Sequence, residues 1–264
     1  MPELPEVETV VRSLAPVTGQ RLVRAEFADT RILRGGDPAL LAARLRGRRL
    51  LSIRRHGKFI VVALEGGGYL TIHLGMTGRL LLGGEAGKHT HAVFTLERSR
   101  LLFDDSRKFG SIEFSEEFPA RLERLGPEPL EVGFEEFFTA LHLRRTRIKS
   151  LLLNQTFLRG VGNIYADEAL FRAAIHPAAL ACRIRRERAL RLHTAIVDVL
   201  GEAIEAGGSS ISDYVDAEGR EGFFQISHRV YQRTGEPCVV CGAPIQRVVI
   251  TQRSSHFCPK CQKR

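Results

Sequence analysis

Tryptophan is absent from the 264 residues, and no apolar run approaches the ~18–20 residues that a membrane-spanning helix needs. The longest clean strand-like apolar run extends only from Phe59 to Leu64. The opening stretch MPELPEVETV has acids and prolines where a signal peptide would have a basic segment and an apolar core. These absences predict a soluble, intracellular protein without a membrane segment.

Acidic residues are missing from three separate stretches of a chain whose formal net charge is +9. The stretches are Arg44–Lys58, Arg144–Arg159 and Arg247–Arg264, and each contains several Lys or Arg. Such runs are usually solvated surface, but three in separate parts of one chain favour a polyanionic partner, and nucleic acid in particular. A membrane surface would instead require a basic amphipathic helix with large apolar residues opposite the charges, which these stretches do not show.

Disordered, collagen-like and low-complexity classes are excluded by composition, because 44% of the residues are hydrophobic and 26% are charged. Domains usually span ~100–200 residues, so the length suits one large or two modest domains.

Four of the five cysteines form the pattern C-x2-C-x16-C-x2-C. Each C-x2-C knuckle can turn two thiolates toward one centre, and four thiolates suit a tetrahedral zinc ion. Two disulfides or four unrelated thiols are the alternatives, and an intracellular setting disfavours disulfides. We therefore predict one structural zinc ion bound by Cys238, Cys241, Cys258 and Cys261. The fifth, Cys182, lies in an Ala-rich stretch and is interpreted as a small buried hydrophobe.

The N-terminal half predicts one helix followed by a β-rich domain. Pro5 to Leu14 has an early proline, acids in the first turn and valines on one face. From about Arg21 to Phe114 the pattern is one of short β-runs (59–64, 69–74, 92–96, 100–103 and 111–114) separated by Gly-rich turns. A β-sandwich with a leading helix is predicted over residues 1–125.

The C-terminal half follows a Pro- and Gly-rich linker at 126–133, and its period is helical. Helices are predicted at 134–143, 147–153, 163–174 and 187–206. The turn at 154–163 carries glycines just ahead of a helix start, where exposed N–H groups could bind phosphate; a plain helix–helix turn is the alternative. The Gly-rich stretch 207–222 predicts a mobile loop. The fold class is therefore α+β, with a helical domain at 134–228 and a four-cysteine zinc hairpin at 229–264.

Met1-Pro2-Glu3 raises a chemical possibility. Removal of the initiator Met would leave Pro2 as a terminal secondary amine, and an α-amino group with a pKa of ~7.7–8.0 is partly neutral and nucleophilic near neutral pH. Amines form Schiff bases with aldehydic sugar carbons, and Glu3 could move the protons. Many proteins begin with Met-Pro without such a role, so the dipeptide alone leaves the question open.

A set of motifs runs in order along the whole chain: MPELPEVET at 1–9, HGK at 56–58, HLGMTG at 73–78, KHTH at 88–91, DSRKFG at 105–110, GPEPL at 126–130, GVGNIYADEALF at 160–171, and TQR ahead of CPKC. Together they resemble the formamidopyrimidine-DNA glycosylase family, bacterial enzymes for oxidised purines such as 8-oxoguanine. The related endonuclease VIII branch usually begins MPEGPE and lacks HLGM. Leu4 and Met76 therefore favour the purine branch.

The resemblance implies a two-step reaction on damaged double-stranded DNA. Pro2 would attack C1′ of the damaged nucleotide, with Glu3 as the acid. Lys58 would contact phosphate and assist β-elimination, and Arg253 would hold phosphate and assist δ-elimination. The implied enzyme is a bifunctional glycosylase and AP lyase of base excision repair, monomeric and cytoplasmic in a bacterium, associated with the nucleoid through DNA.

The resemblance also implies how DNA is held. The implied DNA contacts are His89, Arg107, Arg144 and Asn163. A glycosylase must extrude the damaged nucleotide and fill the gap left in the stack. The residues that match this role, the void-filling residues, are Met76, Arg107 and Phe109. The segment around 212–224 matches the loop that closes over the flipped base.

Two other functions stay open at this point. An endonuclease VIII-like enzyme would share Pro2, Glu3 and the zinc hairpin but act on oxidised pyrimidines. A non-enzymatic zinc-containing DNA-binding protein would use the same basic surface and would not need a free terminal amine.

Overall fold

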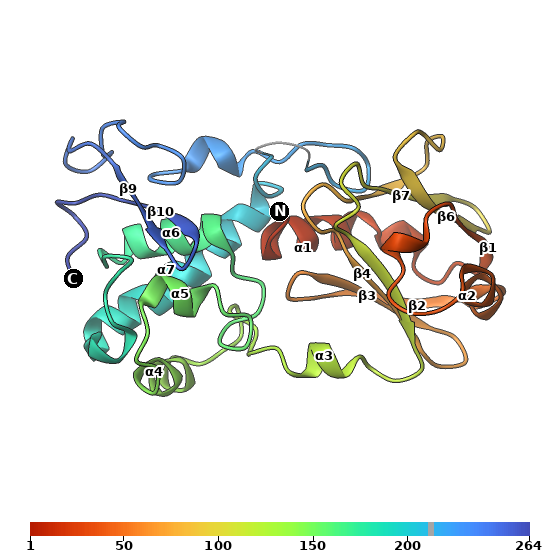
Figure 1. The fold of residues 1–264 in the computed structure, drawn as a ribbon, viewed down its shortest axis with the longest axis horizontal. Helices are drawn as coiled ribbons and strands as arrows, with labels where there is room; N and C mark the ends of the chain where they lie inside the picture. Colours follow the sequence, from red (N-terminus) through yellow and green to blue (C-terminus); the bar gives the residue numbers. More distant parts are fainter. Residues whose placement is uncertain (211–213) are drawn as a thin grey trace. The chain divides into compact units, whose positions relative to one another are not determined.

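The computed structural model describes residues 1–210 and 214–264 and divides them into two compact units (Figure 1). The first unit is Met1–Arg124 together with Ala206–Gln225, and the second is Leu125–Glu205 together with Ile226–Arg264. Within the described residues, no helix is both long and apolar enough to cross a membrane.

The first unit is a β-sandwich with helix α1 (Leu4–Ser13) packed against it. One antiparallel sheet has the strand order β1-β6-β7-β5, with bounds Leu22–Phe27, Thr90–Leu96, Arg100–Asp104 and Arg79–Leu82. The other has the order β2-β3-β4-β8, with bounds Leu50–His56, Phe59–Leu64, Tyr69–His73 and Ser111–Ser115. The alternating apolar side chains of both sheets form one buried core, which Val7 and Val10 of α1 join. The predicted sandwich with a leading helix is confirmed.

Some elements of this unit were not predicted. Helix α2 (Pro38–Leu45) lies inside the range interpreted as β-runs, and a short helix α3 (Ala120–Glu123) follows β8. Asp37 caps α2 by accepting hydrogen bonds from the N–H groups of Ala39 and Leu40, a local signal that the sequence does contain. Strand β2 was not predicted because the adjacent Arg54 and Arg55 interrupt the alternation of apolar and polar residues.

Residues 206–225 belong to the first unit, whereas the sequence-based boundary placed them with the helical domain. Buried polar contacts explain this grouping. The Glu6 carboxylate accepts a hydrogen bond from the Ser209 N–H at 2.8 Å, and the Tyr214 hydroxyl donates to the Glu6 carbonyl at 3.1 Å. The Ala217 N–H donates to the Ser13 hydroxyl at 3.1 Å. Of the predicted base-covering loop, positions 212 and 213 lie outside the described residues.

The second unit contains the four predicted helices and a two-stranded hairpin. The helices are α4 (Phe134–His142), α5 (Ile148–Leu152), α6 (Asn163–Arg172) and α7 (Arg186–Glu205). The hairpin pairs β9 (Gln246–Ile250) with β10 (Arg253–Phe257), and the four-cysteine cluster flanks it. The α+β class and the helical region ending in a cysteine hairpin are confirmed.

Candidate active site and metal centre

The two residues predicted to carry the chemistry lie at the start of α1. Pro2 is buried, and Glu3, which is only 3% exposed, is the N-cap of the helix. The Glu6 carboxylate accepts a hydrogen bond from the Glu3 N–H at 2.8 Å, which fixes the backbone where the chain enters the helix. The positive end of the α1 dipole stabilises a carboxylate at this position.

Lys58 lies at the turn between β2 and β3 and is 8% exposed. Helix α1 packs against both of these strands. Arg55 of β2 binds Glu8 of α1 at 2.9 Å, with both side chains largely buried. Although burial raises the pKa of Glu8, hydrogen bonds from Arg12 and Arg55 outweigh it and lower the pKa overall. The same unit thus ties the strands that flank Lys58 to the helix that begins at Glu3.

The three void-filling residues lie on two adjoining turns of the first unit. Met76 follows β4 and is 41% exposed, and Phe109 precedes β8 and is 55% exposed. The Arg107 guanidinium lies 4.6 Å from the centre of the Phe109 ring. Gly75 adopts a positive φ of 63°, and a Cβ there would overlap the backbone of Phe109 and Gly110. The two turns therefore meet backbone against backbone, with the apolar and cationic side chains exposed.

His73 supports the first of these turns. Its Nδ1 accepts a hydrogen bond from the Gly75 N–H at 3.1 Å. Burial, reinforced by the nearby charges of Lys58, Arg34 and Arg121, lowers the pKa of His73 to about 4. The neutral imidazole that the hydrogen bond requires is therefore the form present at neutral pH.

Asn163 is the first residue of α6, in the second unit. The turn before it is braced by Gln155, whose Oε1 accepts from the Gly160 N–H and whose Nε2 donates to the Val161 carbonyl. Gly160 has a φ of +88°, which a side chain would resist. Asn163 Oδ1 is buried and has no hydrogen-bond partner among the described residues, so this oxygen can still accept a hydrogen bond.

Arg253 lies at the exposed end of the β9–β10 hairpin. Thr251 and Gln252 form the two-residue turn, and both have positive φ, the geometry that matches the twist of a hairpin. The Thr251 hydroxyl lies 2.7 Å from the Ser150 hydroxyl of α5, which holds the turn against the helical region. The Arg253 side chain has no carboxylate partner among the described residues.

A buried ionic network joins the hairpin to the helices. Lys149 of α5 is fully buried and donates to Asp167 Oδ1 at 2.7 Å and to the Asn163 carbonyl at 2.8 Å. The other Asp167 oxygen accepts from the His256 N–H of β10 at 2.9 Å. Asn163 and the hairpin that carries Arg253 are thereby fixed within one unit. Arg144 follows α4 as an exposed side chain, outside this network.

The four predicted ligand cysteines converge. Their sulfur atoms all lie within 4.8 Å of one another, with Cys241 and Cys258 3.4 Å apart and Cys238 and Cys261 3.9 Å apart. A tetrahedral zinc ion with Zn–S bonds of ~2.3 Å separates its sulfur ligands by ~3.8 Å, whereas a disulfide would bring them to ~2.05 Å. The Val240 and Cys261 N–H groups each point to a knuckle sulfur at 3.4 Å. The geometry fits a metal ion and not disulfides.

The thiols influence one another's protonation. The backbone hydrogen bond at Ala243 lowers the pKa of Cys241 to about 7, and hydrogen bonds from the other three thiols contribute. Burial raises the pKa of Cys261, and the neighbouring cysteines raise it further. The Cys241 thiolate is therefore favoured and the Cys261 thiolate is opposed, and a bound cation would stabilise the Cys261 thiolate.

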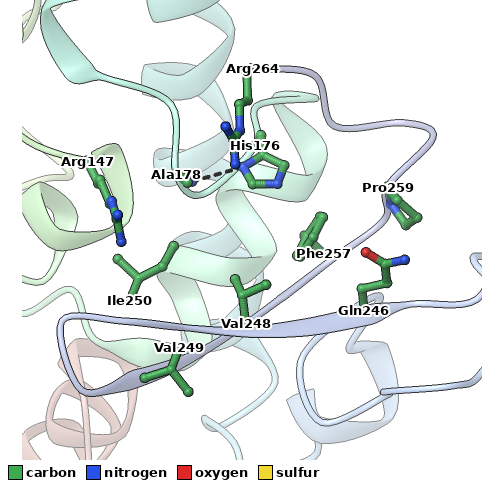
Figure 2. Close-up of a pocket in the computed structure, with 10 residues that line it drawn as sticks. All are labelled: Arg147, His176, Ala178, Gln246, Val248, Val249, Ile250, Phe257, Pro259 and Arg264. Carbon is green, nitrogen blue, oxygen red and sulfur yellow. Dashed lines mark hydrogen bonds between the residues drawn. The ribbon is translucent and has the colours of Figure 1, made fainter.

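A separate pocket of about 430 Å³ opens beside the hairpin (Figure 2). Its floor is apolar, and Arg147, His176 and Arg264 stand at its edges. The His176 Nδ1 accepts a hydrogen bond from the Ala178 N–H at 3.0 Å. None of the predicted site residues lines this pocket, so it is distinct from the candidate site.

Several residues that organise the site were not predicted from the sequence. In the sequence, Glu6 is one of the acids in a predicted first turn, Lys149 belongs to a basic stretch, and Asp105 begins the DSRKFG motif. Asp105 is fully buried, and its hydrogen bonds reach both void-filling turns. Because Asp104 stands directly beside Asp105, the local sequence does not indicate which of the two acids is buried.

Comparison with known proteins covers the whole chain. The models described as the formamidopyrimidine-DNA glycosylase N-terminal domain, its H2TH domain, and a zinc finger found in FPG and IleRS match residues 1–112, 125–215 and 235–264. A curated formamidopyrimidine-DNA glycosylase from Solibacter usitatus is 74% identical over 264 residues, covering 100% of both chains.

Solved structures agree with these matches. The MutM (Fpg) protein from Thermus thermophilus is 46% identical, with a TM-score of 0.90, covering 99% of this chain and 98% of that one. A Lactococcus lactis Fpg mutant in complex with DNA containing Fapy-dG is 36% identical, with a TM-score of 0.93 and full coverage of both chains.

Proposed function

The chain belongs to the formamidopyrimidine-DNA glycosylase family, and from this premise we propose that it excises oxidised purines from double-stranded DNA and then cleaves the strand as an AP lyase. The observation that carries the proposal is the buried Pro2–Glu3 pair at the start of α1, in a chain that matches the family from end to end. The zinc finger module completes the enzyme, and its four cysteines bind one structural zinc ion.

The reaction begins with the amine of Pro2 once Met1 is removed. The amine attacks C1′ and the bond from C1′ to the damaged base breaks. The proline nitrogen then loses its proton and the bond from C1′ to the ring oxygen opens, with Glu3 supplying the proton that the ring oxygen or the leaving base takes up. The resulting iminium acidifies the C2′ proton. Loss of that proton expels the 3′ phosphate, and a second elimination expels the 5′ phosphate.

Other residues hold the DNA during these steps. Lys58 and Arg253 would bind phosphates and support the β- and δ-eliminations, and Asn163 would grip a phosphate at the start of α6. His89 and Arg144, both exposed, would make further contacts with DNA. Met76, Arg107 and Phe109 would fill the space of the extruded nucleotide. We expect a monomer that acts in the cytoplasm on the nucleoid.

The family match weighs against the two rival functions. A non-enzymatic DNA-binding protein would not need the first-turn geometry around Glu3, and the curated relatives are named as glycosylases of formamidopyrimidine. An endonuclease VIII-like preference for oxidised pyrimidines is opposed by Leu4 and by the Met76 turn. A panel of duplexes with oxidised purines and pyrimidines distinguishes the two enzyme specificities directly.

Borohydride trapping tests the proposed chemistry. Reduction of the iminium should link wild-type protein covalently to DNA containing 8-oxoguanine or an abasic site. An alanine inserted ahead of Pro2 converts the amine into an amide and should abolish the adduct while lesion binding persists. Glu3→Gln should lose base excision and retain trapping on a preformed abasic site. A normal trapping rate with the blocked terminus would place the nucleophile elsewhere, and Lys58 would be tested next.

A further inference from the structure

Asp105 lies directly after β7 and is 0% exposed. Its Oδ1 accepts hydrogen bonds from the Thr77 hydroxyl at 2.5 Å and from the Arg107 N–H at 3.1 Å. Its Oδ2 accepts from the Gly110 N–H at 2.7 Å. Among the described residues, this carboxylate has no cationic side chain as a partner, and donors from two turns bind both of its oxygens.

These donors are the immediate neighbours of the void-filling residues. Thr77 follows Met76, Arg107 donates through its own backbone, and Gly110 follows Phe109. The backbone of Asp105 also takes part, because its N–H donates to the His89 carbonyl at 2.9 Å. Through its side chain and its backbone, Asp105 thus connects segments that are separate in the sequence and that carry four of the predicted DNA contacts.

The loop that Asp105 holds is costly to form. Lys108, between Arg107 and Phe109, has a φ of +55°, a left-handed conformation that is unfavourable for a non-glycine residue. Its Nζ binds Asp29 at 2.7 Å, which anchors the loop from its outer side. The inner anchor is Asp105, because its two oxygens hold the ends of the loop at Arg107 and Gly110.

We propose that Asp105 is the positioning residue of the void-filling group: it sets the Met76 turn and the Arg107–Phe109 loop in the arrangement that fills the gap in the base stack. The proposal rests on the function proposed above. It assigns no chemical step to Asp105, which does not touch the reacting atoms. The reaction at Pro2 should therefore survive its loss wherever no base stack has to be filled.

Single-stranded DNA is a substrate in which no base stack has to be filled. An abasic site in a single strand has no opposing base and no duplex stack, so trapping there reports on Pro2 and Glu3 without the void-filling group. Trapping or excision at a lesion in a duplex needs the void-filling residues in addition to Pro2 and Glu3. A positioning role predicts that the rate on duplex DNA falls relative to the rate on single-stranded DNA. A general loss of folding would lower both rates together.

Asp105→Asn is the informative variant. It keeps Oδ1 as an acceptor but turns an NH2 group toward the Gly110 N–H, so one end of the loop loses its anchor. A lost hydrogen bond to a charged group is worth ~1.5–3 kcal/mol, so the single-turnover rate on a duplex with 8-oxoguanine should fall at least about tenfold. The borohydride-trapping rate on a single-stranded abasic oligonucleotide should stay within about twofold of wild type.

Two further variants sharpen the test. Thr77→Val removes one donor to Asp105 at nearly constant volume and should lower the duplex rate selectively, by a smaller factor. Asp104→Asn is the matched control, because within the described residues the Asp104 side chain bonds to the Thr90 hydroxyl alone, at 2.6 Å, and not to the loop. It should leave both rates unchanged.

The outcomes separate this inference from the proposed function. Equal duplex rates for Asp105→Asn and wild type would overturn the positioning role. So would a parallel fall on duplex and single-stranded DNA for both Asp105→Asn and Thr77→Val. Absence of any adduct with wild-type protein would instead overturn the proposed glycosylase chemistry itself.

Discussion

His73 shows how one partly buried side chain can link the pH dependence of stability to a functional turn. In the folded protein its pKa is about 4, below the ordinary value of 6.5, because burial and nearby cations oppose the charged form. Between these two values the unfolded chain binds the proton and the folded chain does not. The contribution of His73 is therefore fully present above about pH 6.5 and is lost as the pH falls toward 4.

We expect the wild-type protein to lose about 2 kcal/mol more unfolding free energy than His73→Asn between about pH 7.5 and pH 5. Asparagine can accept the Gly75 hydrogen bond but does not titrate in this range. Urea titrations at the two pH values measure the difference. His89→Asn, at an exposed histidine outside the Gly75 turn, is the control. Parallel pH profiles for wild type and His73→Asn would contradict the assigned cause.

At the scale of the element, the zinc hairpin depends on its metal. The β9–β10 pair is short, and a two-stranded hairpin alone is marginally stable in water. The small core beneath it includes Cys238 and Cys258 themselves. Metal binding therefore supplies much of the folding free energy of this module.

We expect about one zinc ion per chain, and Cys258→Ser should unfold the hairpin, misplace Arg253 and weaken DNA binding, while the first unit keeps its β-structure. Metal analysis, circular dichroism and a DNA-binding titration measure these effects. Cys182→Ser, at a cysteine outside the cluster, should change none of them. Less than half an equivalent of zinc in carefully purified wild type, or unimpaired DNA binding by Cys258→Ser, would contradict the prediction.

At the scale of the whole molecule, the net charge is +9, and the cationic side chains that contact phosphates determine how DNA binding responds to salt. Lys and Arg that contact phosphates release counterions, and each contributes roughly 0.9 to the slope of log affinity against log salt concentration. The acid-free stretches Arg44–Lys58 and Arg247–Arg264 contain Lys58 and Arg253, the two phosphate contacts proposed for catalysis.

Lys58→Ala and Arg253→Ala should each flatten that slope by about one unit, because each removes one phosphate contact. Binding isotherms with a duplex containing an abasic-site analogue, over a series of salt concentrations, measure the slope. Arg191→Ala removes the same charge from an exposed residue paired with Glu187 at 2.7 Å, and should leave the slope unchanged. An unchanged slope in both test variants would remove Lys58 and Arg253 from the phosphate contacts.

The sequence by itself determined the features that depend on neighbouring residues. The two C-x2-C knuckles specified the metal ligands, because each places two thiols on one short turn. The periods of apolar residues located α1, the four helices of the second unit and most strands of the sandwich, because burial of one face imposes those periods. The ordered motifs identified the family and, through it, candidate residues such as Pro2 and Glu3.

The tertiary structure decided what depends on residues far apart in the chain. Thr77 and Asp105 are 28 positions apart, and Glu6 and Ser209 are 203 apart, so no local pattern could pair them. Lys149 lies in a basic stretch that suggested solvent exposure or DNA contact, yet it is fully buried against Asp167. A charged residue has the same local signature whether it meets water or a buried partner. Only the packing of distant segments distinguishes the two.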